Sequence, residues 1–343
     1  MKSKLKDVLF IGIILFLVVT GAYAATYLYN ADEVSYDNSN SNLLSTDIQN
    51  ALDELYTKCN SSTTTCPSGH TCTQKTNIKC KRATALHTET CINGDTSHYC
   101  QKDGYAQNDI IIYGNETTIE GVLTVGDAFD CDVNGDGTFD STTERFYYVG
   151  DYYDTSNKAF NDMIAVLVYY SNTDDGVASI TNVAYDSNAI NWNGPITAIT
   201  ELPTTTQWSN IRLYKEVRQI LTDNDKTSTN GRTLPSNFSY SGYSARLLTS
   251  QEIINGCYNY SEGFNIFFSL SKNCKFLFEN TSYHDFSLVT DGSWLETPGG
   301  TSGLSTSYAW ASSSRNLASV TTGNSFKHGA RPVIEVLKSE ILY

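Results

Sequence analysis

The segment ARLLTSQEIINGC occupies residues 245–257 and organises the C-terminal part of the chain. Its two consecutive leucines end a short apolar run of the kind that forms a buried strand. Thr249 follows as a helix N-cap, and Glu252 completes a capping box, in which hydroxyl and carboxylate each accept a backbone amide. Gly256 is the residue type that ends a helix. The segment therefore predicts a strand, a tight turn and a short helix that ends at Gly256.

Three segments together resemble a known superfamily. The segment quoted above is similar to the pattern aRLPT..E of the formylglycine-generating-enzyme and C-type-lectin-like superfamily. The stretch WLETP at residues 294–298 resembles the WLRSP strand of that superfamily, and GARPVI at residues 329–334 resembles its closing GVRP strand. The resemblance covers residues 118–343, with the segments in the same order. It implies an α+β domain, mainly antiparallel β with short helices, and we draw this domain as 106–343.

This resemblance also bears on enzymatic activity. The copper oxidases of the superfamily use two cysteines late in the domain, whereas the last cysteine of this chain is Cys274, so their chemistry does not carry over. We find no Ser-His-acid pattern, no zinc-protease motif and no phosphate-binding glycine loop, and we predict that the protein is not an enzyme.

Four tryptophans lie in the C-terminal half, and most of them are expected in the core. Trp294 and Trp310 are the candidates for stacking on a sugar ring.

The composition is that of a β-rich extracellular protein. The chain has 343 residues, of which 40% are hydrophobic and only 17% are charged, and 23 are tyrosines. Its net charge of −14 argues against nucleic-acid binding, which requires clusters of Lys and Arg.

The first residues of the chain have the pattern of an export signal. Lys2, Lys4 and Lys6 precede an apolar run, and Ala-Tyr-Ala at residues 22–24 resembles a signal-peptidase site. Residues 1–24 are therefore predicted to be a signal peptide or, as an equal alternative, an uncleaved membrane anchor. Either outcome predicts an extracellular protein, secreted or held at the cell surface.

Residues 25–58 are predicted to form a helical stalk. Ile48, Leu52 and Leu55 have coiled-coil spacing, and so short a helix is marginal in water without a partner. The segment resembles a module of phage tail fibres and bacterial surface proteins, which implies a homotrimer. Packing of the helix on its own domain is an equal alternative.

Residues 59–105 are predicted to form a disulfide-rich module, because cysteines are dense there and apolar residues are scarce. Six cysteines lie in this segment: Cys59, Cys66, Cys72, Cys80, Cys91 and Cys100. We expect them to pair among themselves; zinc binding is the less favoured alternative, because no C-x-x-C pair is present. Cys257 and Cys274 are expected to form a bridge within the C-terminal domain, which leaves Cys131 free or paired elsewhere.

The stretch DVNGDGTFD at residues 132–140 resembles a calcium-binding loop. Asp132, Asn134, Asp136 and Asp140 are its candidate oxygen ligands. The acid expected at the last ligand position, Glu144, comes one residue late, so any calcium site should be weak. The alternative is a β-hairpin tip without metal, since Asn-Gly and Asp-Gly are strong turn pairs.

Strands are also expected at Ile110–Tyr113, Gly121–Val125, Phe146–Val149 and Ile164–Tyr170, and a helix at Ile211–Leu221. The function that these observations favour is adhesion: capture of an extracellular glycan or surface protein by the C-terminal domain. The alternative is a structural surface or fibre subunit without a ligand pocket.

Overall fold

The computed structural model describes residues 77–91, 107–115, 122–188, 193–220, 237–257, 268–269, 272–280, 292–298, 306–311, 316–321 and 327–343. The expected signal peptide or anchor, the expected stalk and Cys59, Cys66, Cys72 and Cys100 lie outside these residues. Within the part of the chain that is described, no helix is long and apolar enough to cross a membrane.

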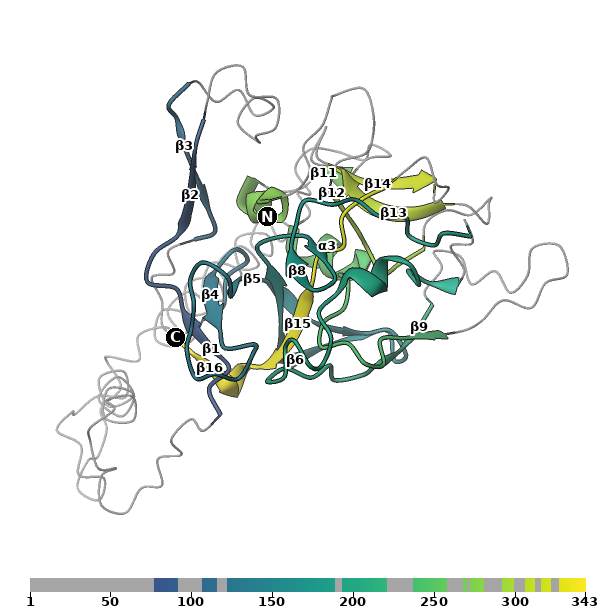
Figure 1. Cartoon of the computed structure of the whole chain (residues 1–343), viewed down its shortest axis with the longest axis horizontal. Coiled ribbons are helices and arrows are strands. Elements are labelled where there is room, and N and C mark those ends of the chain that lie inside the picture. The colour runs from purple at the N-terminus through teal and green to yellow at the C-terminus, as the bar shows by residue number, and fades with distance from the viewer. Residues whose placement is uncertain are drawn as a thin grey trace, which may run out of the picture. The chain divides into compact units, whose positions relative to one another are not determined.

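A six-stranded sheet forms the centre of the described domain (Figure 1). Its strand order is β15, β6, β5, β4, β1, β16, and every neighbouring pair is antiparallel except β1 and β16. The six strands are β1 (Cys80–Arg82), β4 (Ala128–Cys131), β5 (Arg145–Asp154), β6 (Ala159–Tyr169), β15 (Val333–Leu337) and β16 (Ile341–Leu342). The long strands β5 and β6 are rich in aromatic and β-branched residues, which favour a pleated, buried backbone.

Both faces of the sheet are covered by hydrophobic cores. Phe146 of β5 packs into one core with Trp208, and its neighbour Tyr147 points to the opposite core with Ile253. Because successive side chains of a strand alternate between faces, a strand covered on both sides must be apolar almost throughout. The sequence of β5, RFYYVGDYYD, meets this requirement except at its charged residues, Arg145, Asp151 and Asp154.

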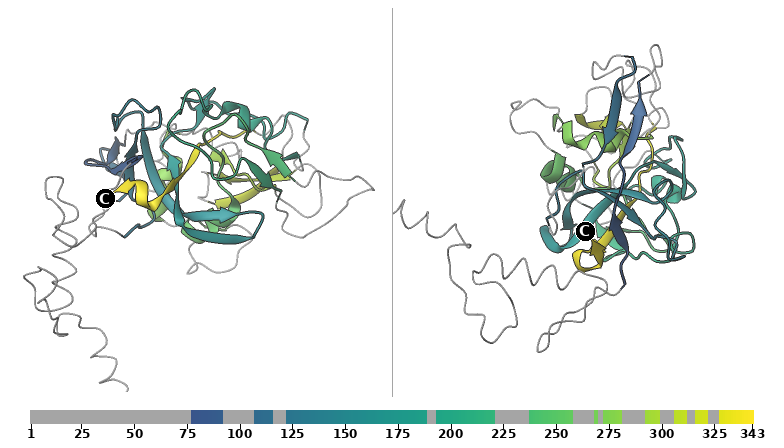
Figure 2. Two further views of the ribbon diagram at one scale, coloured as in Figure 1. Left: turned by 90° about the horizontal axis from the view of Figure 1, so that it is seen from below. Right: turned by 90° about the vertical axis from the view of Figure 1, so that its left-hand side faces the viewer.

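Smaller sheets and short helices surround this centre (Figure 2). The second sheet has the order β11 (Phe268–Ser269), β14 (Asn316–Thr321), β13 (Thr306–Ala311), β12 (Gly292–Trp294). Three two-stranded ribbons pair β2 (His87–Thr90) with β3 (Ile110–Tyr113), β7 (Thr173–Asp174) with β8 (Val177–Ala178), and β9 (Val217–Gln219) with β10 (Asn237–Ser239). The helices are α3 (Ser250–Cys257) and the 3-10 turns η4 (Ala198–Glu201), η6 (Lys272–Phe278) and η7 (Lys338–Glu340).

The described domain is thus mainly antiparallel β with few helices, as predicted. The strands expected at 110–113, 146–149 and 164–170 are confirmed. The strand expected at Gly121–Val125 is wrong for its described part, residues 122–125, which contain no strand. The helix expected at Ile211–Leu221 is also wrong, because the described part of this segment is extended and includes β9.

The strand β1 lies between β4 and β16 in the central sheet, so it belongs to the C-terminal domain. The compact unit that contains this sheet runs from Thr76 to Tyr343, whereas the sequence predicted a boundary after residue 105. The cysteine-rich segment therefore contributes its second part to the domain itself. A short strand of three residues gave no periodic signal from which this could be predicted.

The disulfide of β1 corrects the predicted pairing. Cys80 bonds to Cys131, which lies directly opposite it on β4, so Cys80 does not pair within its own segment. The predicted bridge between Cys257 and Cys274 is confirmed. Cys91 is also disulfide-bonded.

The predicted capping box is present at the start of α3. The Glu252 amide donates to the Thr249 hydroxyl at 3.1 Å, and the Thr249 amide donates to the Glu252 carboxylate at 3.0 Å. The helix continues one residue past Gly256, and this glycine has a packing role. A Cβ at Gly256 would lie 2.0 Å from the backbone oxygen of Val149 on β5.

We expect Gly256→Ala to destabilise the domain by at least about 2 kcal/mol, because the contact with a strand carbonyl cannot be relieved by a side-chain rotation. The alanine gains at most about 1 kcal/mol in helix propensity, which is too little to compensate. Chemical denaturation of the two proteins measures the difference. Asn255→Ala, at the exposed neighbouring position of the same helix, is the control and should change stability little. Equal stability of Gly256→Ala and the wild type would contradict the close approach of α3 and β5.

The ribbon β2–β3, which projects from the central sheet (Figure 1), is fastened to the domain through His87. The Nδ1 atom of His87 lies 2.6 Å from the Glu279 carboxylate, and Nε2 lies 2.6 Å from the carbonyl oxygen of Ser141. Both neighbours are acceptors, so a protonated ring satisfies both. Burial and the nearby Arg145 act to lower the pKa of His87, but Glu279 raises it above its ordinary value.

A raised pKa in the folded state means that protonation of His87 stabilises the fold. This stabilisation is complete below about pH 6.5, the unfolded value, and is lost as the pH rises through the folded pKa. We therefore expect a double-mutant cycle of His87→Gln and Glu279→Gln, followed by thermal unfolding, to show coupling that decreases from pH 5.5 to pH 9. A coupling independent of pH would exclude the protonated bridge.

Candidate functional site

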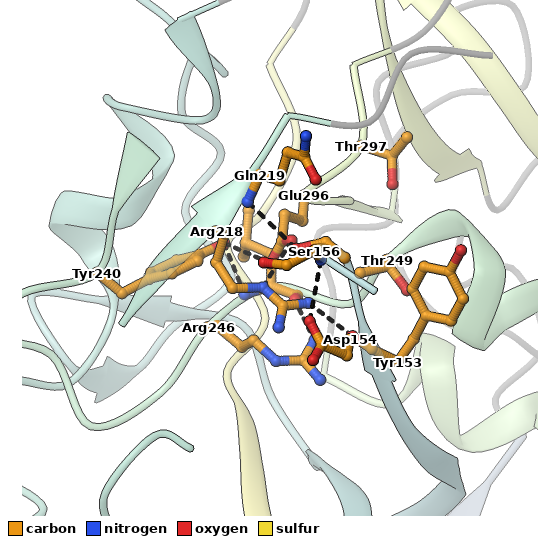
Figure 3. Close-up of polar contacts among 12 residues, drawn as sticks. Tyr153, Asp154, Ser156, Arg218, Gln219, Tyr240, Arg246, Thr249, Glu296 and Thr297 are labelled. Atoms are coloured by element: carbon orange, nitrogen blue, oxygen red, sulfur yellow. Dashed lines mark hydrogen bonds and ion pairs between the residues drawn. The ribbon is translucent and has the colours of Figure 1, made fainter. Parts of the chain in front are cut away.

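Two arginines and three glutamates, all buried, form an ionic network inside the domain; Figure 3 shows Arg218, Arg246 and Glu296 of this set. Arg246 precedes α3 and forms two parallel hydrogen bonds with Glu252, of 2.9 Å from Nη1 and 2.6 Å from Nη2. Its Nε donates to Glu335 on β15 at 2.5 Å. Such paired, two-point contacts fix the guanidinium plane as well as its position.

Arg218 of β9 forms the second half of the network. Its Nε donates to Glu296 at 3.0 Å, Nη1 donates to the Tyr152 hydroxyl at 2.6 Å, and Nη2 donates to the carbonyl oxygen of Tyr153. The ring of Tyr152 lies near both arginines, with its centroid 5.2 Å from the guanidinium carbon of Arg218 and 5.6 Å from that of Arg246. The aromatic ring thus contacts both cations and joins the two ion pairs.

The three segments singled out in the sequence meet around this network. The Arg246 amide donates to the Val333 carbonyl at 3.0 Å, and the Glu296 amide donates to the Leu248 carbonyl at 2.7 Å. The Trp294 amide donates to Gly329 in the third segment at 2.9 Å. Residues from 245 to 334 are therefore brought together by backbone hydrogen bonds as well as by charge.

The charges of the network do not balance, since three carboxylates face two guanidinium groups. Burial acts to raise the pKa of Glu252, but the adjacent Arg246 lowers it below its ordinary value overall. Burial raises the pKa of Glu296 even though Arg218 opposes this shift. Glu296 consequently takes a proton more readily than Glu252 does.

A cavity of about 260 Å³ opens beside this network. Its lining combines apolar and polar side chains: Ile164, Ile211 and Leu337, with Lys79, Asn210, Arg212, Tyr214, Glu335 and Glu340. These residues come from the segment before β1, from the extended segment that leads to β9, and from β6, β15 and η7.

Glu335 connects the cavity to the interior. One carboxylate oxygen accepts from Arg246, and the other accepts the backbone amide of Tyr214 at 2.6 Å. Arg246 joins α3 to β15 through its ion pairs with Glu252 and Glu335, and the ion pair with Glu335 also holds the cavity wall.

Tyr214 gives the cavity an exposed aromatic edge. Its side chain is 58% exposed, and its ring packs edge-on against Tyr152 with centroids 5.5 Å apart. Asn210 is oriented by two contacts: Lys79 Nζ donates to its side-chain oxygen, and its Nδ2 donates to the carbonyl oxygen of Asp132 at 2.7 Å. A fixed amide, an aromatic ring and nearby cations are groups that recognise small polar ligands.

The loop predicted to bind calcium packs against this wall of the cavity, through Asn210. Two amides of the loop donate to the Asp132 carboxylate, and the Glu144 carboxylate accepts the amides of Val133 and Asp140. Asp136 is exposed, and its hydrogen bonds with Thr138 lower its pKa. Among the described residues, no three or more His, Cys, Asp or Glu side chains form a group suited to a metal ion. Calcium binding by Asp132, Asn134, Asp136 and Asp140 stays a prediction.

If the loop binds calcium at about 10⁻³ M, 5 mM calcium should stabilise the native protein by about 1 kcal/mol. We expect a rise in melting temperature that magnesium reproduces poorly, because it demands tighter octahedral geometry. Asp136→Ala should abolish the rise, while Asp162→Ala, at an exposed site on β6, should retain it. A melting temperature that is insensitive to calcium would mean that the loop is a turn without metal.

The structure corrects one of the two predicted ligand-binding tryptophans. Trp294 is fully buried, its Nε1 donates to the Val183 carbonyl at 2.8 Å, and its ring packs against Tyr185 and His328. It has no face open to a ligand, because the whole residue is buried in the core. Burial of so large an apolar ring stabilises the fold. Trp310 lies on β13 opposite Ser293, and its side chain is outside the described part.

Sequence reasoning missed the residues that line the cavity. A signal was present in the run Ile211 to Tyr214, where apolar and polar-ended residues alternate with the period of a strand. In the structure Ile211 is buried, while Arg212 and Tyr214 are exposed, as this alternation predicts. Lys79 is too distant in sequence for its position to be inferred.

Comparisons of this chain with protein-family models, with curated proteins and with solved structures found no match.

Proposed function

We propose that this chain is an exported bacterial surface protein that binds an extracellular ligand through its C-terminal domain, in the manner of an adhesin. The ligand is a glycan or a surface protein. The observation that carries the proposal is the cavity edged by Tyr214, in which an exposed ring lies beside a fixed amide and charged groups. This cavity replaces Trp294 as the expected binding site.

The cavity is suited to recognition because hydrogen bonds hold two of its lining side chains in place. Asn210 is held on both sides of its amide, and Glu335 is held by Arg246 and by the Tyr214 amide. A preorganised site loses little conformational entropy on binding, which supports affinity from few contacts. A glycan is favoured over a protein, because the cavity admits a small group and offers a ring for stacking.

The finer assignment of the fold is part of the proposal. We infer a C-type-lectin-like α+β domain from the convergence of the segments around Arg246, Trp294 and Val333. The N-terminal residues 1–24 serve as signal peptide or membrane anchor, and residues 25–58 serve as a stalk that assembles a homotrimer. The protein is not an enzyme in this proposal.

A structural role as a surface or fibre subunit is the competing function. A structural subunit has no ligand to lose, so substitutions at the cavity should change no binding measurement. Ligand binding predicts the opposite, so the two functions are separated by a binding measurement on cavity variants.

We expect the full exported chain to bind glycans on an array, and Tyr214→Ala to weaken that binding about tenfold, equivalent to about 1.4 kcal/mol, because the ring is lost. Tyr214→Phe is the matched control, since it keeps the ring and removes only the hydroxyl. Circular dichroism checks that both variants remain folded. Binding to no glycan and no host surface protein would favour the structural role.

A further inference from the structure

Two cationic side chains line the cavity of a strongly acidic protein. The chain has 23 Lys and Arg against 37 Asp and Glu, yet Lys79 and Arg212 both line this one cavity. Neither cation pairs with a carboxylate of the described residues: Lys79 Nζ donates to Asn210, and Arg212 Nη1 donates to the carbonyl oxygen of Ile211 at 2.7 Å.

The two acids of the cavity do not pair with these cations. Glu335 accepts hydrogen bonds from Arg246, whose Nε lies 2.5 Å from its carboxylate, and from the Tyr214 amide. Glu340 is the other acid that lines the cavity. The N–H donors of Arg212 and Lys79 are therefore not occupied by a carboxylate of the described residues. An anionic group that enters the cavity meets partners whose hydrogen-bonding capacity is not used up by other acids.

The shape and the other lining groups select the kind of anion. The cavity holds about 260 Å³, which suits one small ring and excludes a long segment of chain. Tyr214 offers an exposed aromatic face at the edge, and Leu337 adds apolar surface. A sugar ring has an apolar face for the tyrosine and polar edges for Asn210, whereas an aspartate or glutamate side chain has no ring to stack.

We propose that this cavity binds an acidic sugar, with the anionic group of the sugar at Arg212 and Lys79 and its ring against Tyr214. The inference rests on the proposed ligand-binding function and specifies the chemical class of its ligand. A carboxylate matches the planar fork of the Arg212 guanidinium, which can donate two parallel hydrogen bonds. A sulfated sugar offers the same charge, and the experiment below distinguishes a sugar carboxylate from a sugar sulfate.

Isothermal titration at low ionic strength tests the assignment on the full exported chain. The probes are a disaccharide that ends in glucuronic acid, the matched disaccharide that ends in glucose, a disaccharide that ends in a sulfated glucose, and a peptide rich in glutamate. We expect the glucuronic acid probe to bind at least tenfold more tightly than the glucose probe. The sulfated probe should fall between them, and the peptide should not bind.

Variants assign the preference to the two cations. Arg212→Gln should remove most of the preference for the acidic probe, whereas Arg212→Lys should retain part of it. Lys79→Gln gives a second, independent test, in case one variant fails to fold. Lys338→Gln is the matched control: it removes a cation of η7 that pairs with Asp151 at 2.8 Å and does not line the cavity. It should leave the preference unchanged.

Each outcome bears on a separate claim. Equal affinity for the glucuronic acid and glucose probes would overturn the acidic-sugar assignment and leave the ligand-binding function intact. Binding of the peptide in place of the sugars, or equal loss of preference in Lys338→Gln and Arg212→Gln, would overturn it as well. Binding of no probe and of no glycan on an array would overturn both the assignment and the proposed function.

Discussion

The burial of the Arg246 guanidinium is the constraint on which the rest of the domain depends. Removing a cation from water costs several kcal/mol, and the cost is offset only if carboxylates with good geometry surround it. Glu252 from α3 and Glu335 from β15 provide these carboxylates. The oxygen Oε2 of Glu252 accepts both from Arg246 and from the Thr249 amide. The start of the helix and the buried ion pair are therefore one structural unit.

The same network determines the geometry of the surface. Glu335 is bound by Arg246 on the inner side and by the Tyr214 amide on the outer side, while the Tyr214 ring packs against Tyr152. Tyr152 also accepts a hydrogen bond from Arg218. The aromatic edge of the cavity is consequently positioned by the interior of the domain. These contacts fix the position of the cavity edge, which lies on an extended segment between β6 and β9, without a long helix or strand of its own.

The network carries one more carboxylate than it has cations, and Glu296 is one of these carboxylates. The Tyr240 hydroxyl and Arg218 both donate to this side chain, yet burial raises its pKa. Buried ion pairs of this kind add less to stability than their geometry suggests, because desolvation opposes the Coulomb attraction. Their effect here is to hold segments that are distant in sequence in one register.

Local features were predictable, because they depend on spacings of a few residues. The capping box of Thr249 and Glu252 follows from residues three apart, and the strand around Phe146 follows from a continuous apolar run. The bridge between Cys257 and Cys274 spans 17 residues. By contrast, Cys80 and Cys131 are 51 residues apart and meet only because β1 and β4 pair in the central sheet.

The sequence by itself determined the β-rich character of the domain and the cap that begins α3, because composition and residue spacing act within single elements. The resemblance to a known superfamily indicated the three segments that meet around Arg246 and implied mainly antiparallel β structure. Only the tertiary structure decided that Trp294 is core, that Gly256 is needed for a close contact with Val149, and that Lys79, Arg212 and Tyr214 share a cavity. These facts depend on which elements are neighbours. That choice is made by the pairing of the sheet strands and by the requirement that every buried charge meet its partner.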